Sequence, residues 1–199
     1  MLQTACFDLG NVLLFFDHNK MFTQISVLSG LSSAAVKALA TPAIQEAYEQ
    51  GTLTSQELYR HFQAQAPRSF TFDAFMHAMA DIFTPNTPLW PTLHLLKQAG
   101  LQLILISNTC ESHYLFAERN YPILSLFDYK VLSYEVGSLK PYSPIFKKAL
   151  KLAKKNVFFT DDLLVNVEGA RKAGLDSELY EDVSSLQSHL IQRGCHFLK

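Results

Sequence analysis

The stretch Ala5-Cys6-Phe7-Asp8-Leu9-Gly10-Asn11-Val12-Leu13-Leu14 places one carboxylate at the end of an apolar run and a glycine two residues later. A lone aspartate after a strand is often only a turn or cap residue. The function of Asp8 therefore depends on whether the rest of the chain brings further polar groups to the same place.

The composition is that of an ordinary folded protein. The chain has 199 residues, of which 48% are hydrophobic and 18% are charged, which excludes an intrinsically disordered chain. This length fits one sizeable domain or a core with a modest insertion. Lys and Arg number 17 against 18 Asp and Glu. We therefore expect neither a nucleic acid nor a membrane as a partner.

The cysteines and the N-terminus bear on the cellular compartment. Cys6, Cys110 and Cys195 are odd in number and lack CxxC spacing, which predicts reduced thiols rather than disulfides or a zinc site. The N-terminus lacks a signal-peptide pattern, and no run approaches about 18 apolar residues. These features favour a cytoplasmic protein.

The organisation predicted is a catalytic core with an inserted helical cap. Helical spacing without a clear strand runs through residues 17–83, and Thr54 and Glu57 have the spacing of a capping box. A helical stretch of about 65 residues is too long for a plain crossover between strands. We therefore expect a cap at 17–83 and a core made of 1–16 and 84–199.

The second half of the chain alternates strands and helices. After a first strand at 3–7, apolar runs predict strands at 101–106, 129–132, 156–160 and 177–180, with helices beginning near Thr87, Ser143, Asn166 and Ser184. Near-continuous apolar strands alternating with helices are typical of a parallel sheet covered on both faces. The predicted fold is a doubly wound, Rossmann-like α/β sheet.

Polar residues follow three of the predicted strands. These are Asp8, the pair Ser107-Asn108 and the pair Asp161-Asp162. The carboxyl ends of parallel strands meet at one edge of a sheet, where open α/β folds bind ligands. Carboxylates gathered there call for a cation, and all-oxygen ligands suit Mg²⁺. A hydroxyl, backbone amides and the nearby Lys140 suit phosphate oxygens.

Four segments together resemble one known family, the haloacid dehalogenase-like hydrolases, in the Mg²⁺-dependent phosphatase branch with a helical cap after the first strand. The segments are Phe7-Asp8-Leu9-Gly10-Asn11-Val12, Ile106-Ser107-Asn108-Thr109, Gly137-Ser138-Leu139-Lys140-Pro141 and Asp161-Asp162-Leu163-Leu164-Val165-Asn166-Val167-Glu168. The Gly-Asn form of the first segment also resembles a subset that includes sugar-phosphate phosphatases. Order, spacing and cap cover nearly the whole chain.

The resemblance implies a role for each site residue. Asp8 would attack phosphorus to give an aspartyl-phosphate, which water then hydrolyses. Asp8, Asp162 and the carbonyl of Gly10 would hold Mg²⁺, with Asp161 a nearby or water-mediated ligand. Ser107 and the amide of Asn108 would bind phosphoryl oxygens, and Lys140 would neutralise charge and orient Asp8.

One departure from the family pattern concerns the proton donor. The family phosphatases carry a second aspartate two residues after the nucleophile as general acid and base, and this chain has Gly10 there. Either the substrate has a good leaving group, such as an anomeric or acyl phosphate, or another residue replaces the acid. Asp17 and His18 are candidates for that replacement, although a helix-capping role is favoured for them.

The function predicted from the sequence is a Mg²⁺-dependent phosphatase acting on a small phosphorylated metabolite, including sugar phosphates, as a monomer or small homo-oligomer. A dehalogenase is disfavoured because halide displacement does not need the acidic pair. The alternatives left open are a weak or inactive relative that binds a phospho-ligand or a protein partner, and a phosphomutase or phosphotransferase.

Overall fold

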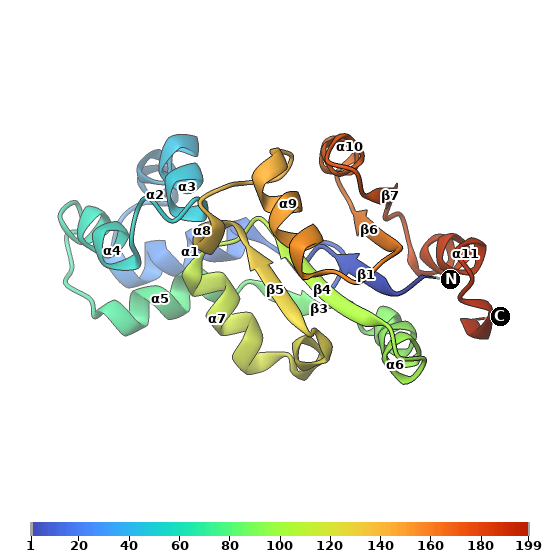
Figure 1. Ribbon diagram of the computed structural model, residues 1–199. Helices are drawn as coiled ribbons and strands as arrows, with labels where there is room; N and C mark the ends of the chain where they lie inside the picture. The colour runs from blue at the N-terminus through green and yellow to red at the C-terminus, as the bar shows by residue number, and fades with distance from the viewer. Residues whose placement is uncertain (1, 199) are drawn as a thin grey trace.

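The centre of the molecule is a five-stranded parallel sheet. The computed structural model describes residues 2–198. Its strands are β1 (Thr4–Phe7), β4 (Gln102–Ser107), β5 (Tyr129–Leu132), β6 (Val157–Asp161) and β7 (Asp176–Leu179), in the spatial order β5-β4-β1-β6-β7, and every neighbouring pair is parallel. This confirms the predicted doubly wound α/β fold, with β1 in the middle of the sheet (Figure 1).

Alternate residues of the central strands supply two separate hydrophobic cores. In β1, Phe7 faces one core and Cys6 faces the other. In β4, Leu103 and Leu105 belong to the first core, and Ile104 belongs to the second. Because side chains alternate across a strand, a continuous apolar run is what a sheet covered on both faces requires.

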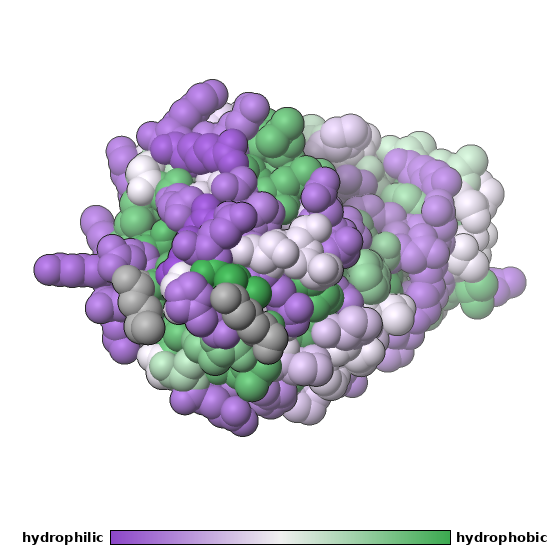
Figure 2. Space-filling model, turned by 90° about the vertical axis from the view of Figure 1, so that its right-hand side faces the viewer, coloured by the Kyte–Doolittle hydropathy of each residue, from purple (hydrophilic) through white to green (hydrophobic). Residues whose placement is uncertain are grey.

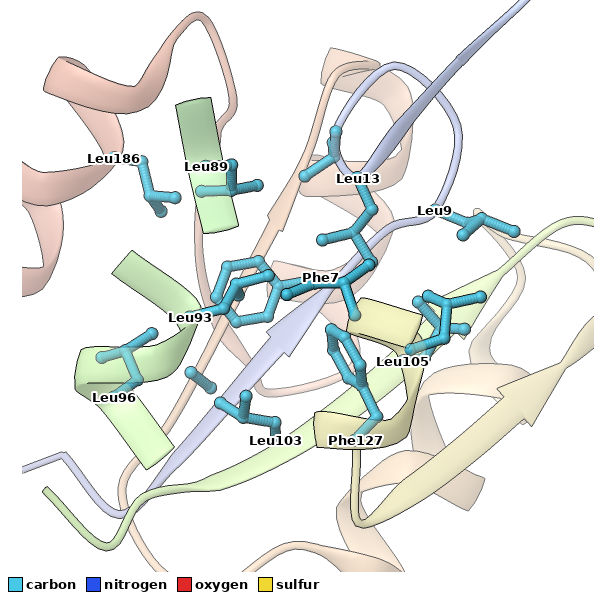
Figure 3. Packing of buried hydrophobic residues seen from close by; sticks show 14 of the residues in the cluster. Phe7, Leu9, Leu13, Leu89, Leu93, Leu96, Leu103, Leu105, Phe127 and Leu186 are labelled. Atoms are coloured by element: carbon cyan, nitrogen blue, oxygen red, sulfur yellow. The ribbon is translucent and has the colours of Figure 1, made fainter. Parts of the chain in front are cut away.

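Helices cover the two faces of the sheet. On the first face lie α6 (Trp90–Gln98), α7 (Glu111–Asn120) and α11 (Val183–Gln192). Leu93 and Leu96 of α6 and Leu186 of α11 belong there to the same cluster as Phe7 and Phe127 (Figure 3). On the second face lie α9 (Ser143–Leu152) and α10 (Leu164–Lys172), whose buried residues pack against Phe159 and Ile104. Short turns at Thr87–Leu89, Pro122–Leu126, Ser133–Val136 (α8) and His196–Leu198 complete this part of the chain.

A purely helical segment with its own hydrophobic core follows β1. It consists of α1 (His18–Ser29), α2 (Ser33–Leu39), α3 (Pro42–Glu49), α4 (Ser55–Gln63) and α5 (Phe72–Ala80), which we call the helical segment. It extends to one side of the sheet (Figure 1). The predicted capping box of α4 is confirmed, because Thr54 and Glu57 bond reciprocally to each other's backbone N–H groups. The division into a cap at 17–83 and a core remains a prediction.

A small antiparallel ribbon joins the helical segment to the sheet. It pairs β2 (Leu14–Phe16) with β3 (Phe83–Pro85), one strand before the helical segment and one after it. The sequence did not predict this ribbon, because three residues are too few to establish an alternating pattern. The ribbon fixes where the chain leaves the sheet edge and where it returns.

The three cysteines are buried inside the protein and form no disulfide bond. Cys6, Cys110 and Cys195 are all buried free thiols, which agrees with the predicted absence of disulfides. Within residues 2–198, no helix is long and apolar enough to cross a membrane. The end of the molecule that carries both termini is covered mainly by hydrophilic side chains with smaller hydrophobic patches between them (Figure 2).

Candidate active site

Asp8 lies directly after β1, at the carboxyl edge of the sheet. Its backbone N–H donates to the carbonyl of Thr160 at 3.1 Å, so the residue is still held by the neighbouring strand. Its side chain is 10% exposed and accepts a hydrogen bond from the N–H of Leu9 at 2.6 Å. The carboxylate is therefore buried, fixed in direction and open to a ligand from one side.

Lys140 contacts two of the predicted site carboxylates. Its Nζ lies 2.7 Å from Oδ1 of Asp8 and 2.5 Å from Oδ2 of Asp161, and its side chain is 1% exposed. The ring of Phe159 lies beneath the ammonium, 5.6 Å from Nζ. A buried cation needs such partners, because burial without paired charges costs several kcal/mol. Lys140 thus joins the ends of β1 and β6.

The Asn108 side chain holds the backbone of Lys140 in place. Its Oδ1 accepts from the Lys140 N–H at 2.7 Å, and its Nδ2 donates to the Lys140 carbonyl at 3.0 Å. Asn108 follows Ser107, the last residue of β4, whose side chain is buried. The side chain of Asn108 therefore positions Lys140. The sequence had predicted a role only for the backbone amide of Asn108, as a ligand of phosphoryl oxygens.

Burial dominates the electrostatics of Asp8. It raises the pKa of Asp8 to about 7; the ammonium of Lys140 opposes this shift, and the carboxylate of Asp161 reinforces it. The pKa of Lys140 is raised by Asp8 and Asp161, which outweigh its own burial. Further positive charge at this edge would favour the ionised, nucleophilic form of Asp8.

The two aspartates after β6 have different surroundings. Asp161 is fully buried; its Oδ1 accepts from the N–H of Leu163 and from Nδ2 of Asn166, both at 2.9 Å, while Oδ2 accepts from Lys140. Asp162 is partly exposed, and its Oδ2 accepts from Nδ2 of Asn11 at 3.0 Å. Asp161 is therefore held inside the cluster by its partners, and Asp162 lies at the partly exposed side of the cluster.

The donor set at this edge fits a hard divalent cation. Carboxylate oxygens of Asp8, Asp161 and Asp162 lie within 4.8 Å of one another. Oxygen-only ligands of this kind suit Mg²⁺ better than zinc, which favours His and Cys. Gly10 lies in the same turn as Asn11, whose side chain contacts Asp162. The structure thus brings together Asp8, Gly10, Ser107, Asn108, Lys140, Asp161 and Asp162 at one edge.

The space beside Gly10 is filled by an aromatic ring. A Cβ atom built on Gly10 would lie 2.9 Å from Cε1 of Phe16, closer than a Cβ ordinarily comes to another heavy atom. Phe16 belongs to β2 and is 38% exposed. The position that carries the general acid in the resembled family is here covered by the ribbon.

The two residues considered as replacements for that acid differ in their roles. Asp17 is the N-cap of α1, and its Oδ1 accepts from the N–H of Asn19 at 2.8 Å, which is the favoured capping role. The imidazole of His18 packs against Phe16 with 4.9 Å between ring centroids. Burial and the nearby His113 lower the pKa of His18, against the opposing charge of Asp17.

Three residues near this edge had no signal in the sequence. The Ser133 hydroxyl lies 2.7 Å from the carbonyl of Glu49, and it accepts from the N–H of Thr109 at 3.0 Å. Burial raises the pKa of Glu49, and His113 and Lys140 oppose the shift. Burial lowers the pKa of His113. Only the folded chain brings Glu49, His113 and Ser133 together.

The fold and the carboxylate-lysine cluster place the protein in a class of α/β proteins whose polar site lies at the carboxyl edge of a parallel sheet. A family model described as "haloacid dehalogenase-like hydrolase" matches residues 2–174. The chain belongs to this family.

Solved structures of other family members resemble this chain in fold. An enzyme of the family from Bacteroides thetaiotaomicron, solved with magnesium and inorganic phosphate, superposes with a TM-score of 0.80 over 94% of this chain and 99% of its own, at 22% identity. A 2-haloacid dehalogenase from Pseudomonas syringae pv. Tomato DC3000 superposes with a TM-score of 0.69 over 98% and 100%, at 16% identity. At these identities the likeness concerns the fold.

A curated relative matches part of the chain. The bifunctional epoxide hydrolase 2 of Rattus norvegicus is 28% identical over 130 residues, which are 61% of this chain and 23% of the rat protein. The matched stretch is thus less than a quarter of that relative, and its activities are those of a longer protein.

Proposed function

We propose that this protein is a Mg²⁺-dependent phosphatase that hydrolyses a small phosphorylated metabolite through an aspartyl-phosphate on Asp8. The observation that carries the proposal is the contact of Lys140 Nζ with Asp8 at 2.7 Å inside a cluster of three carboxylates. A buried carboxylate nucleophile with a lysine beside it suits phosphoryl transfer, which depends chiefly on positioning and charge stabilisation.

The chain's own residues account for the bond changes. An oxygen of Asp8 forms a bond to phosphorus as the bond from phosphorus to the leaving oxygen breaks. Water then attacks phosphorus, and the electron pair of the Asp8–phosphorus bond returns to the carboxylate. Lys140 steadies the charge on Asp8 in both steps, and Ser107 with the N–H of Asn108 binds phosphoryl oxygens. Asn108 keeps Lys140 in reach through its side chain.

Mg²⁺ is the cofactor proposed for this site. Asp8, Asp162 and the carbonyl of Gly10 would hold it, with Asp161 in support, and when bound it would neutralise phosphoryl charge as a Lewis acid. The magnesium and inorganic phosphate in the Bacteroides thetaiotaomicron enzyme are consistent with that choice.

The acidic pair Asp161-Asp162 favours phosphoryl transfer over dehalogenation. Displacing halide from carbon needs a carboxylate nucleophile but no cation, and the proximity of Asp162 to Asp8 would then only add repulsion. Gly10 supports a narrower substrate class, because phosphates with a good leaving group, such as anomeric or acyl phosphates, depend least on a proton donor.

The direct test is Mg²⁺-dependent hydrolysis of p-nitrophenyl phosphate, followed by a screen of sugar phosphates, nucleotides and acyl phosphates. We expect turnover that disappears on chelation and in Asp8→Asn. Asp73→Asn, an exposed aspartate on α5, is the matched control and should keep full activity.

Other results would point to the alternatives. No turnover by folded, Mg²⁺-saturated protein would overturn the phosphatase and leave a phospho-ligand or protein-binding relative. Transfer of the phosphoryl group to a second metabolite, in place of release of inorganic phosphate, would identify a phosphotransferase or mutase.

A further inference from the structure

The proposed reaction lacks a proton donor at its usual place. Gly10 has no side chain, and the ring of Phe16 stands where a side chain at that position would begin. A leaving alkoxide is a poor leaving group unless a proton reaches it, and such a proton transfer contributes about 10²–10⁴ in rate. A donor for less activated substrates must therefore come from another element.

The end of helix α3 is fastened to the site by its backbone. The carbonyl of Glu49 lies 2.7 Å from the hydroxyl of Ser133 in α8, which also bonds to Thr109, the residue after Ser107-Asn108. Two residues further, Gly51 lies so close to α8 that a Cβ on it would be 2.1 Å from the carbonyl oxygen of Tyr134. This close contact places Glu49 next to the phosphate-binding segment.

The Glu49 carboxyl interacts with titratable groups on two other parts of the structure and on its own helix. It interacts electrostatically with His113 of α7, with Lys140 beside Asp8, and with Glu46 of its own helix. Lys140 in turn lies 2.7 Å from Asp8. The Glu49 carboxyl of the helical segment therefore interacts electrostatically with the lysine that contacts the nucleophile.

The three titratable groups Glu49, His18 and His113 differ in the direction of their pKa shifts. Burial raises the pKa of Glu49, so the carboxyl keeps a proton at higher pH than an ordinary glutamic acid. Burial lowers the pKa of both His18 and His113, so each imidazole gives up its proton more readily to solvent near neutral pH. We choose Glu49 among the three because its backbone is held by Ser133, which also bonds to Thr109 next to Ser107-Asn108.

We propose that the Glu49 carboxyl, carried by helix α3, is the general acid and base that replaces the side chain absent at Gly10. This inference rests on the proposed phosphatase function. As the bond from phosphorus to the leaving oxygen breaks, that oxygen takes the Glu49 proton. Water then attacks the aspartyl-phosphate and passes a proton to the Glu49 carboxylate, which restores the acid. Asp8 regains its electron pair, so no external co-reactant is needed.

The test uses a series of substituted phenyl phosphates, whose leaving phenols differ in acidity but little in size. With Glu49→Gln we expect kcat/KM for phenyl phosphate to fall by about 10²–10⁴ and that for p-nitrophenyl phosphate to fall less than about tenfold. Glu49→Asp should recover part of the loss. The alkaline limb of the wild-type pH profile should also disappear in Glu49→Gln.

The matched control is Glu181→Gln, an exposed glutamate outside the helical segment, which should leave the whole series unchanged. A purely structural role for Glu49 would lower kcat/KM by one factor across the series, and that result would overturn the inference. So would an unchanged series in Glu49→Gln. Both results leave the phosphatase intact, whereas a wild-type protein that turns over no member of the series would overturn the phosphatase and this inference together.

Discussion

At the scale of single residues, Lys140 is the group on which the site depends most. Its ammonium is buried between Asp8 and Asp161, and its backbone is fixed by Asn108. Without it two buried carboxylates would face each other, and the pKa of Asp8 would rise further because its chief opposing charge is gone.

Lys140→Met should therefore damage both activity and stability. We expect hydrolysis of an aryl phosphate to fall by at least about 10³, since a charge contact of several kcal/mol is lost from the transition state. Removing one partner from a buried ion pair costs about 3–5 kcal/mol, partly relieved here by protonation of a carboxyl group. Steady-state kinetics and urea unfolding measure the two effects.

Lys148→Met is the control for that substitution, because Lys148 is an exposed lysine of α9. It should change neither measurement. A Lys140→Met protein as active and as stable as wild type would show that the buried ion pair has no part in catalysis or folding.

At the scale of elements, the ends of the strands could be predicted from the sequence, whereas the ribbon of β2 and β3 could not. Asp8, Ser107 and Asp161 follow or end apolar runs, so the rule that parallel strands share a carboxyl edge was enough to gather them. Phe16 and Glu49 approach the site through a three-residue strand and a helix end, and no local pattern encodes that approach. Contacts between segments distant in sequence decide such positions.

The close contact between the helical segment and α8 yields a prediction. Gly51 has φ +72°, and a Cβ there would lie 2.1 Å from the Tyr134 carbonyl oxygen. Gly51→Ala should shift the end of α3 away from α8, break the bond between Glu49 and Ser133, and raise KM. The melting temperature should fall as well.

Gly100→Ala separates this effect from backbone strain. Gly100 has φ +82°, but a Cβ there would meet nothing within 4 Å. In both variants an alanine at positive φ lowers the free energy of unfolding by about 1 kcal/mol. Gly51→Ala should be the more destabilised and the only one with a raised KM; equal effects in the two variants would contradict a tight contact with α8.

At the scale of the whole molecule, the buried imidazole of His113 makes stability depend on pH. Burial lowers its pKa in the folded protein, against the bond to the Met79 carbonyl and the charge of Glu49. Below the unfolded-state pKa of about 6.5, the unfolded chain binds this proton more readily than the folded chain. The His113 contribution is therefore complete above that pH and is lost as the pH falls from there through the lower pKa of the folded state.

His113→Gln should flatten this dependence. Relative to this variant, wild type should lose free energy of unfolding as the pH falls below about 6.5, because Asp8, whose pKa is raised, titrates in both proteins. The raised pKa of Glu49 makes the free energy of unfolding change in the opposite direction as the pH falls. The wild type and the variant are therefore compared with each other at each pH. Urea unfolding at several pH values gives the two curves, and parallel curves would contradict a depressed His113 pKa.

The fold class and the convergence of Asp8, Ser107 and Asp161 at one edge of the sheet could thus be predicted, because each rests on a repeated local pattern. The helical segment's contribution could not, because Glu49, His113 and Ser133 are separated by long stretches of chain and meet only through packing. The family match over residues 2–174 agrees with the part that the sequence revealed.

The proposed function depends above all on phosphorylation of Asp8 during turnover, and acid quenching can trap that phosphorylated form. Wild-type protein is mixed with Mg²⁺ and excess aryl phosphate, quenched in acid and digested. The masses of its peptides are then measured by mass spectrometry. We expect one added phosphoryl group on the peptide that contains Asp8, labile to hydroxylamine and absent from Asp8→Asn. Turnover with no phosphorylated peptide, or with the phosphoryl group on another residue, would contradict it.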